Sequence, residues 1–144
     1  MTRKEQLTFL IDALLTEMPE YREQAEAFPT DDAAQRRLLR SLMNVRPPMP
    51  LDPQFLEVQD ALLSAEREEK GVVDGAALPP IAADPRLALW QGDITRIAAD
   101  AIVDADNSAL LGCFAPCHGC IDNAIPHSIT QGFTWSSKIE CCCT

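Results

Sequence analysis

The sequence predicts a mixed α/β fold, in which a helical amino-terminal part precedes a part that contains strands. The first observation is that apolar residues recur at three- and four-residue intervals through the early part of the chain, which is the period of an amphipathic helix. The second is a change of character at Leu87, where short apolar runs begin to alternate with polar loops. Apolar strands that lead into polar loops are typical of an α/β sheet with its site at the carboxyl ends of the strands.

The first predicted helix begins after Thr2 and ends before Pro19. Thr2 and Glu5 have the spacing of a capping box, and proline cannot continue a helix. The apolar stripe of this helix consists of Leu7, Leu10, Ile11, Leu14, Leu15 and Met18. One face of this helix is therefore expected to be buried.

Two further helices are predicted on either side of a proline-rich connector. The second begins at Thr30, whose hydroxyl can accept hydrogen bonds from the first-turn amides. The third has Asp52 as its cap, Pro53 at its first position, and Leu51 with Leu56 as a hydrophobic staple. The apolar faces of the two helices are formed by Leu38, Leu39, Leu42 and Met43, and by Phe55, Val58, Leu62 and Leu63.

The third helix runs into the charged series EREEK, and a segment rich in Gly, Pro and Ala follows from Gly71 to Pro85. This composition is typical of a linker. After it, LALWQGDI from Leu87 and ADAIVDADNS from Ala99 are expected to be buried strands that enter loops.

Composition and charge exclude some classes of partner. The chain has 144 residues, 47% of them hydrophobic, and a net charge of −10, which disfavours general binding to nucleic acid or to anionic membranes. Asp12 interrupts the only early apolar run, so neither a signal peptide nor a membrane span is expected. We therefore expect a cytoplasmic protein whose six cysteines are reduced and serve metal binding or catalysis. The sequence leaves the oligomeric state open.

Three cysteines and one of the two histidines fall within nine residues in the segment GCFAPCHGC, from Gly112 to Cys120. Thiolate sulfur and imidazole nitrogen are ligands that zinc prefers, and three protein donors with one vacant position are typical of a catalytic zinc site. Two alternatives are a structural zinc knuckle and a redox pair formed by Cys117 and Cys120 at CxxC spacing.

Three motifs carry a resemblance to a known family. They are QGDIT at Gln91 to Thr95, then DAIVDADNSALLGCF, then CHGCIDNAI, in this order. Together they resemble the zinc-containing branch of the macrodomain family, whose members bind ADP-ribose and remove it from proteins. The likeness extends from about Leu38 to about Ile125, because LRSLMNVRPP and EREEKG resemble the extension that precedes the macrodomain in that branch.

The resemblance implies a helical extension and linker over residues 1–85, followed over 86–144 by the first part of a three-layer α/β/α macrodomain. It also implies that Asp93 accepts a hydrogen bond from the adenine amino group, assisted by the backbone amide of Ile94. Asn107 would lie near the distal ribose as a ligand-binding and catalytic residue. The sequence departs from the family at Asp104, where asparagine is expected, and at Asp106, where alanine is expected. Both changes add negative charge beside a pocket for a diphosphate.

The family's ligand spacing, carried over to this sequence, gives Cys113, His118 and Cys120 as the zinc ligands and leaves Cys117 as a neighbour. The implied function is zinc-dependent hydrolysis of the N- or O-glycosidic bond between ADP-ribose and a modified protein side chain. Its partners would be ADP-ribose or an ADP-ribosylated protein. Two alternatives are an ADP-ribose-binding module without turnover and a small structural zinc protein.

The likeness ends at about Ile125, and the tail from about residue 126 diverges. Pro126 would break the helix that the family forms here, and the glycine-rich phosphate-binding loop of the family is not found. We therefore expect an incomplete macrodomain in a truncated or frame-shifted chain. The cysteines at 141–143 match no family motif, and palmitoylation or a second metal site are two interpretations of them.

Overall fold

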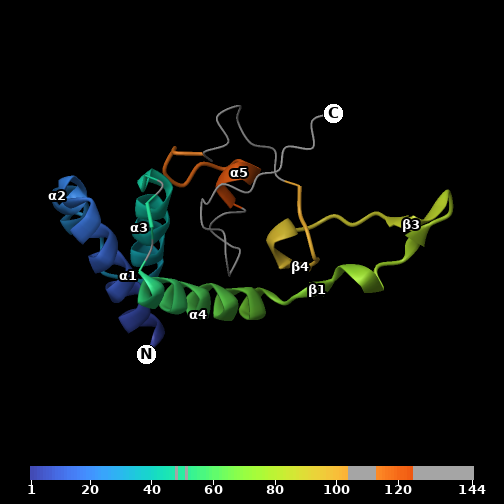
Figure 1. Ribbon diagram of the computed structural model, residues 1–144, viewed down its shortest axis with the longest axis horizontal. Coiled ribbons are helices and arrows are strands. Elements are labelled where there is room, and N and C mark those ends of the chain that lie inside the picture. The colour runs from blue at the N-terminus through green and yellow to red at the C-terminus, as the bar shows by residue number, and fades with distance from the viewer. Residues whose placement is uncertain (48, 51, 104–112, 125–144) are drawn as a thin grey trace.

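A computed structural model describes residues 1–47, 49–50, 52–103 and 113–124 (Figure 1). Within these ranges the chain combines a helical first part with short strands, which confirms the predicted α/β class. The helices gather at one end of the molecule, and the strands extend away from them (Figure 1). No helix in the described ranges is both long enough and apolar enough to cross a membrane.

The first helix, α1 (Arg3–Glu17), has the predicted capping box. The backbone amide of Glu5 donates to Thr2 Oγ1 at 3.3 Å, and the amide of Thr2 donates to Glu5 Oε2 at 2.6 Å. The helix ends before Pro19, as predicted. A 3₁₀ turn, η1 (Pro19–Tyr21), and a short helix, α2 (Arg22–Glu26), follow. The sequence reasoning did not anticipate α2, which has only one buried residue, Ala25.

The second predicted helix is α3 (Asp32–Val45), but its cap differs from the prediction. Asp31, and not Thr30, is the N-cap, and its Oδ1 accepts from the backbone amide of Ala34 at 3.0 Å. A carboxylate satisfies the amide and also complements the positive end of the helix, whereas a hydroxyl does only the first. The correction moves the start of the helix by a single residue.

The third predicted helix is α4 (Pro53–Lys70), and Asp52 caps it as expected. Asp52 Oδ1 accepts from the backbone amides of Gln54 at 2.7 Å and Phe55 at 3.3 Å. Leu51 of the predicted staple lies outside the described residues. The helix ends at Gly71, whose φ of 80° lies in the left-handed region that glycine adopts without strain.

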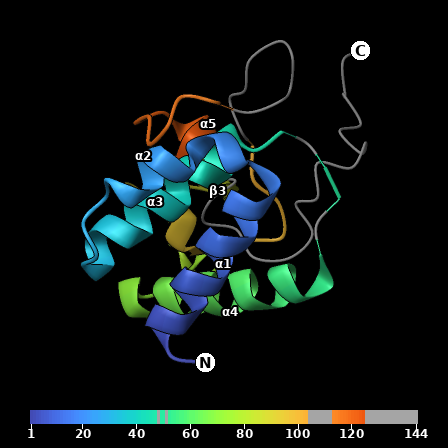
Figure 2. The same cartoon turned by 90° about the vertical axis from the view of Figure 1, so that its left-hand side faces the viewer.

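Helices α1, α3 and α4 share one hydrophobic core, and α1 contacts both other helices, passing in front of α4 in Figure 2. The predicted apolar faces supply this core. Its largest fully buried apolar side chains are Leu10 and Leu14 from α1, Leu39 from α3 and Leu62 from α4. Because burial of a leucine contributes about 1.5–3 kcal/mol, this core is the main source of stability of the helical part.

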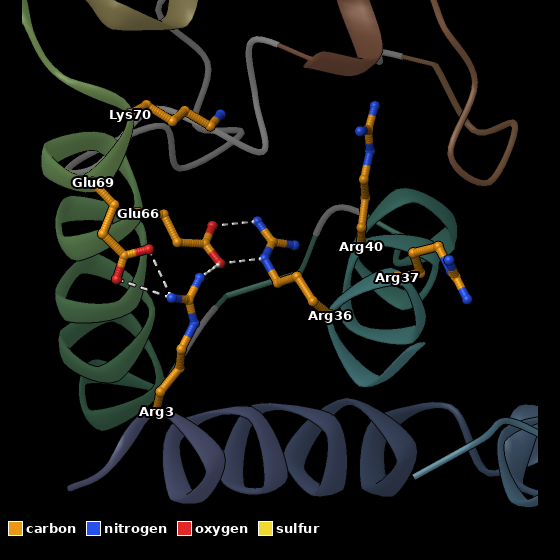
Figure 3. Close-up of a pocket in the computed structure, with 7 residues that line it drawn as sticks. All are labelled: Arg3, Arg36, Arg37, Arg40, Glu66, Glu69 and Lys70. Carbon is orange, nitrogen blue, oxygen red and sulfur yellow. Dashed lines mark hydrogen bonds and ion pairs between the residues drawn. The ribbon is translucent and has the colours of Figure 1, made fainter. Parts of the chain in front are cut away.

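An ionic network joins the same three helices at their surface (Figure 3). Glu66 of α4 accepts from Arg36 of α3 at 2.7 and 2.9 Å, and from Arg3 of α1 at 3.0 Å. Arg3 also donates to both oxygens of Glu69, at 2.8 and 2.9 Å. The network borders an open cavity of about 430 Å³, which Arg37, Arg40 and Lys70 also line.

The strands form two small sheets. In the first, β1 (Val73–Asp74) pairs in parallel with β4 (Ile97–Ala98). In the second, β2 (Pro80–Ile81) pairs antiparallel with β3 (Asp84–Ala88). The 3₁₀ turns η2 (Gly75–Ala77) and η3 (Ile94–Arg96) lie between these strands, and the last described helix is α5 (Ile121–Ala124).

The prediction of buried strands after Leu87 is wrong for the part of this region that the structure describes. Leu87 is 55% exposed, Leu89 81% and Val103 91%. The hairpin of β2 and β3 projects away from the helical core, so the faces of this ribbon remain in solvent (Figure 1). Of the described residues in the two predicted stretches, only Leu87 and Ala88 lie in a strand, β3. Burial of a strand also requires a second layer to cover it.

Candidate metal centre

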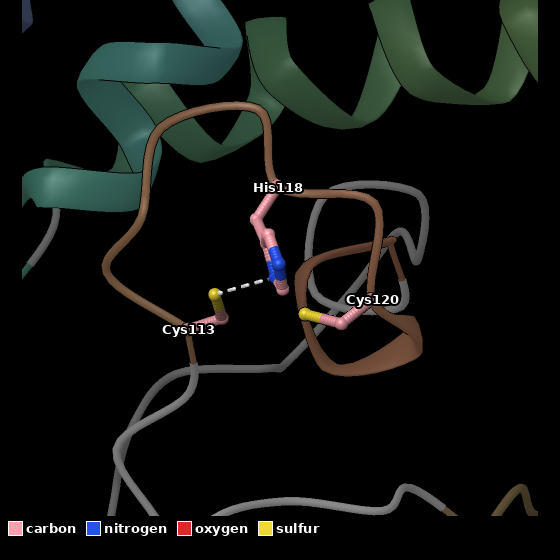
Figure 4. Close-up of side chains that lie close together, drawn as sticks. All are labelled: Cys113, His118 and Cys120. Atoms are coloured by element: carbon pink, nitrogen blue, oxygen red, sulfur yellow. Dashed lines mark hydrogen bonds between the residues drawn. The ribbon is translucent and has the colours of Figure 1, made fainter.

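The loop before α5 brings together the side chains of Cys113, His118 and Cys120 (Figure 4). The ligand atoms of the three residues all lie within 4.8 Å of one another. Cys113 Sγ lies 3.6 Å from His118 Nδ1. Residues separated by as many as seven positions therefore converge on one point, with the thiols half-buried and the imidazole exposed.

The separation of one sulfur and one nitrogen atom matches that expected around a zinc ion. Zinc bonds of about 2.3 Å to sulfur and about 2.0–2.1 Å to nitrogen in a tetrahedral site separate a sulfur from a nitrogen ligand by about 3.5–3.6 Å. Cys113 Sγ and His118 Nδ1 already have this separation. Two thiolates and an imidazole are also the ligand types that zinc prefers. The three residues could thus hold a metal ion.

The thiol of Cys120 favours its protonated form when no metal is present. Burial raises its pKa, and the neighbouring Cys113 thiol and the charge of Asp122 raise it further. The backbone amide of Asn123 acts in the opposite direction. Because a metal binds the thiolate, metal binding at this position must release a proton.

Cys117 points away from the group. Its φ of 53° is in the left-handed region, and its Sγ lies 3.4 Å from Ser41 Oγ and 3.7 Å from the carbonyl oxygen of Arg37, both on α3. The structure thus separates Cys117 from the three converging residues, although it is closer to His118 in sequence than Cys113 is.

Residues that the sequence reasoning missed hold this loop in place. Arg40 and Asn44 of α3 form hydrogen bonds to the loop, and Asn123 of α5 is fully buried between α3 and the loop. The available signal was a polar pair spaced four positions apart, which places both side chains on one face of a helix. Asn123 follows the candidate ligand Cys120 by three positions, so its place in the sequence also points to it as a partner of the metal site.

Asp93 and Ile94 lie elsewhere, at η3 beside the end of α4. Asp93 Oδ1 accepts from the Thr95 amide at 3.0 Å and from Thr95 Oγ1 at 2.6 Å, while Oδ2 lies 3.7 Å from Lys70 Nζ. The hydrogen bond from the Thr95 hydroxyl is the main cause that holds the pKa of Asp93 below its ordinary value. The carboxylate is therefore ionised, and it accepts but cannot donate.

The space beside the Trp90 ring explains why a glycine, Gly92, precedes Asp93. A β-carbon at Gly92 would overlap the ring of Trp90, so any larger residue would displace the indole or the turn. Asn107, Asp104 and Asp106 lie outside the described residues.

No protein-family model matches the chain. It is 45% identical over 127 residues to a protein-ADP-ribose hydrolase of Treponema medium, covering 87% of this chain and 48% of the relative. It is 49% identical over 88 residues to a protein-ADP-ribose hydrolase of Staphylococcus aureus, covering 61% of this chain and 32% of the relative. A third relative is 39% identical over 104 residues, covering 66% of this chain and 17% of its own length. It is a probable bifunctional ADP-ribose hydrolase/ADP-ribosyltransferase of Fusarium oxysporum f. sp. cubense.

The chain spans about half the length of the Treponema relative and about a third of that from Staphylococcus. The identity to the Treponema relative nevertheless extends over most of this chain. The sequence motifs point to the same group of proteins as these comparisons do. Over most of its length the chain is therefore homologous to proteins named protein-ADP-ribose hydrolase.

Proposed function

We propose that the protein removes ADP-ribose from modified protein side chains with the help of a zinc ion. The observation that carries the proposal is the convergence of Cys113, His118 and Cys120 in a chain homologous to protein-ADP-ribose hydrolases. Neither part suffices alone, because three-residue clusters also occur in structural metal sites and the relatives' names specify no metal. Together they support a metal-assisted hydrolase.

The three residues would hold the zinc and keep one position open for the substrate. Two thiolates balance the charge of the ion, and the neutral imidazole completes the set of protein donors. When bound, the ion supplies Lewis acidity that polarises the bond between C1″ of the distal ribose and the modified side chain. Asn107 is proposed to position this ribose, because an amide both donates to and accepts from hydroxyl groups.

Asp93 is proposed to bind the adenine. Its Oδ1 is committed to the turn through Thr95, which leaves Oδ2 to accept from the exocyclic amine of the base. The first amide of a helical turn has no partner within the turn, so the amide of Ile94 is suited to a second hydrogen bond. In this proposal residues 1–85 are the extension and linker, and the macrodomain part begins at 86.

The activity is tested by incubating the zinc-loaded chain with an ADP-ribosylated protein and measuring free ADP-ribose by chromatography. We expect release by the wild type and by Cys117→Ser, and loss of release in Cys113→Ser. Cys117→Ser is the matched control because its thiol lies in the same loop but faces α3.

Calorimetry with ADP-ribose separates the remaining outcomes. Binding heat without release would overturn hydrolysis in favour of a binding module. Zinc retention with neither binding heat nor release would overturn it in favour of a structural zinc protein.

A further inference from the structure

Helix α3 holds the candidate metal loop through its backbone. Asn44, only 5% exposed, donates from Nδ2 to the carbonyl oxygen of Cys113 at 3.2 Å. Its Oδ1 accepts from the backbone amide of Cys117 at 3.1 Å. A single side chain thus spans the first half of the loop and fixes the backbone of one candidate ligand directly.

Arg40, one helical turn earlier, fixes the second half. Its Nη2 donates to the carbonyl oxygen of His118 at 3.3 Å, and its Nε and Nη2 donate to Asn123 Oδ1 at 3.0 and 2.5 Å. Asn123, which is 0% exposed, donates from Nδ2 to the carbonyl oxygen of Ala115 at 3.1 Å. The guanidinium therefore ties the loop to α5 as well as to α3.

These contacts anchor the loop to a rigid element. The opposite side of α3 places Leu38, Leu39 and Leu42 in the hydrophobic core, so the helix cannot shift without disturbing that core. A loop whose backbone is already ordered loses less conformational entropy when its side chains bind a metal. Asn44 and Arg40 act on the ligands through the main chain and do not touch the ligand atoms.

We infer that Asn44 and Arg40 are positioning residues of the metal site, so that the helical extension sets the affinity of the loop for zinc. The inference rests on the proposed binding of zinc by Cys113, His118 and Cys120. In this inference the extension orients the metal ligands in addition to stabilising the fold. Residues that orient metal ligands from outside the coordination sphere commonly change metal affinity by about 10-fold to 100-fold.

The test measures zinc affinity of the full chain by competition with a chromophoric chelator. We expect Asn44→Ala and Arg40→Lys to weaken zinc binding by about 10-fold to 100-fold. Lysine keeps the charge of Arg40 but lacks the planar fork that reaches both Asn123 and His118. Arg37→Ala is the matched control, because Arg37 is a neighbouring arginine of α3 whose side chain has no hydrogen bond or ion pair to the described part of the loop. We expect its affinity to stay within about 3-fold of the wild type.

Two further measurements separate positioning from folding. Circular dichroism and thermal unfolding of the metal-free variants report whether the helical part is intact. The visible absorption of the cobalt-substituted protein reports the ligand geometry, and we expect weaker tetrahedral bands in Asn44→Ala at saturating cobalt. If Asn44→Ala loses helicity, Arg40→Lys decides the question, because its side chain is not part of the core.

Unchanged zinc affinity in a folded Arg40→Lys variant would overturn the inference, as would an equal loss in Arg37→Ala. A wild-type chain that binds no zinc would instead overturn the proposed function together with it. The two failures are therefore distinguishable.

Discussion

Among single residues, Asp93 combines a structural and a proposed recognition role through its two oxygens. Oδ1 caps η3, and Oδ2 lies beside Lys70 with the side chain 46% exposed. A substitution that keeps the capping oxygen at Oδ1 but replaces the acceptor at Oδ2 by a donor would isolate the recognition role. Asparagine has this property, because its oxygen can cap the turn while its amide nitrogen donates.

Asp93→Asn is expected to weaken ADP-ribose binding by about 10-fold, because the new amide faces the donor amine of adenine. The same variant should bind the hypoxanthine analogue of ADP-ribose better than the wild type does, since that base presents an acceptor oxygen. Calorimetry of both proteins with both ligands measures this change in base preference. Equal weakening for the two ligands would contradict base recognition by this side chain.

Glu66 is the residue from which a pH dependence is expected. Burial raises its pKa, but the hydrogen bonds and charges of Arg36 and Arg3 together outweigh burial, so the pKa lies below its ordinary value of 4.5. A carboxyl with a lowered folded-state pKa stabilises the fold above its unfolded-state pKa, and this stabilisation disappears as the pH falls through the folded-state value. The network should therefore be weakened in acid below about pH 4.5.

Glu66→Gln should lower the free energy of unfolding at pH 7 by about 1.5–3 kcal/mol, because it removes charge-assisted hydrogen bonds of a side chain that is 14% exposed. The difference from wild type should shrink when urea unfolding is repeated at pH 3.5. Glu69→Gln is the control, since its side chain is 61% exposed and its loss should cost less than about 1 kcal/mol. A difference that is independent of pH would rule out the ionic explanation.

At the scale of secondary structure elements, the N-cap of α4 is a local sequence feature that contributes to stability. Asp52→Ala should destabilise the protein by about 0.5–2 kcal/mol in urea unfolding, because it leaves two first-turn amides without their acceptor. Glu57→Ala, at an exposed position of the same helix, should change stability by no more than about 0.5 kcal/mol. Equal effects of the two substitutions would mean that the cap contributes nothing specific.

The helices could be predicted from the sequence because their signals are local. The stripe from Leu7 to Met18, the break at Pro19 and the cap at Asp52 each act within a few residues. The prediction of Thr30 as the cap of α3 is wrong: Asp31, the next residue, caps the helix, and its carboxylate also complements the positive end of the helix. The prediction of strand burial after Leu87 is wrong for a different reason, because burial depends on which element covers the strand.

The candidate site was predictable only in part for the same reason. The family's ligand spacing, carried over to this sequence, pointed to Cys113, His118 and Cys120, which the structure brings together. Two other features depend on tertiary structure. They are the orientation of Cys117 toward α3, and the contacts from Arg40 and Asn44, which lie about 70 to 80 positions earlier in the chain. The expectations for Asn107 lie outside the described residues and stay predictions.

For the whole molecule, the structure predicts an uneven distribution of stability. Amide hydrogen exchange should be slowest in α1, α3 and α4, whose buried faces form the core, and fast in the hairpin of β2 and β3. Addition of zinc should slow exchange in residues 113–124 and in the end of α3 that holds them. Protection confined to the loop would contradict coupling between the extension and the metal site.

X-ray absorption at the zinc edge of the chain loaded with one zinc ion measures the ligand set of the metal. We expect two sulfur neighbours at about 2.3 Å, from Cys113 and Cys120, and lighter neighbours at about 2.0 Å that include the imidazole of His118. The spectrum of Cys117→Ser should be the same, because that thiol faces α3. A third sulfur neighbour that disappears in Cys117→Ser, or a wild-type chain that retains no zinc, would contradict zinc binding by Cys113, His118 and Cys120.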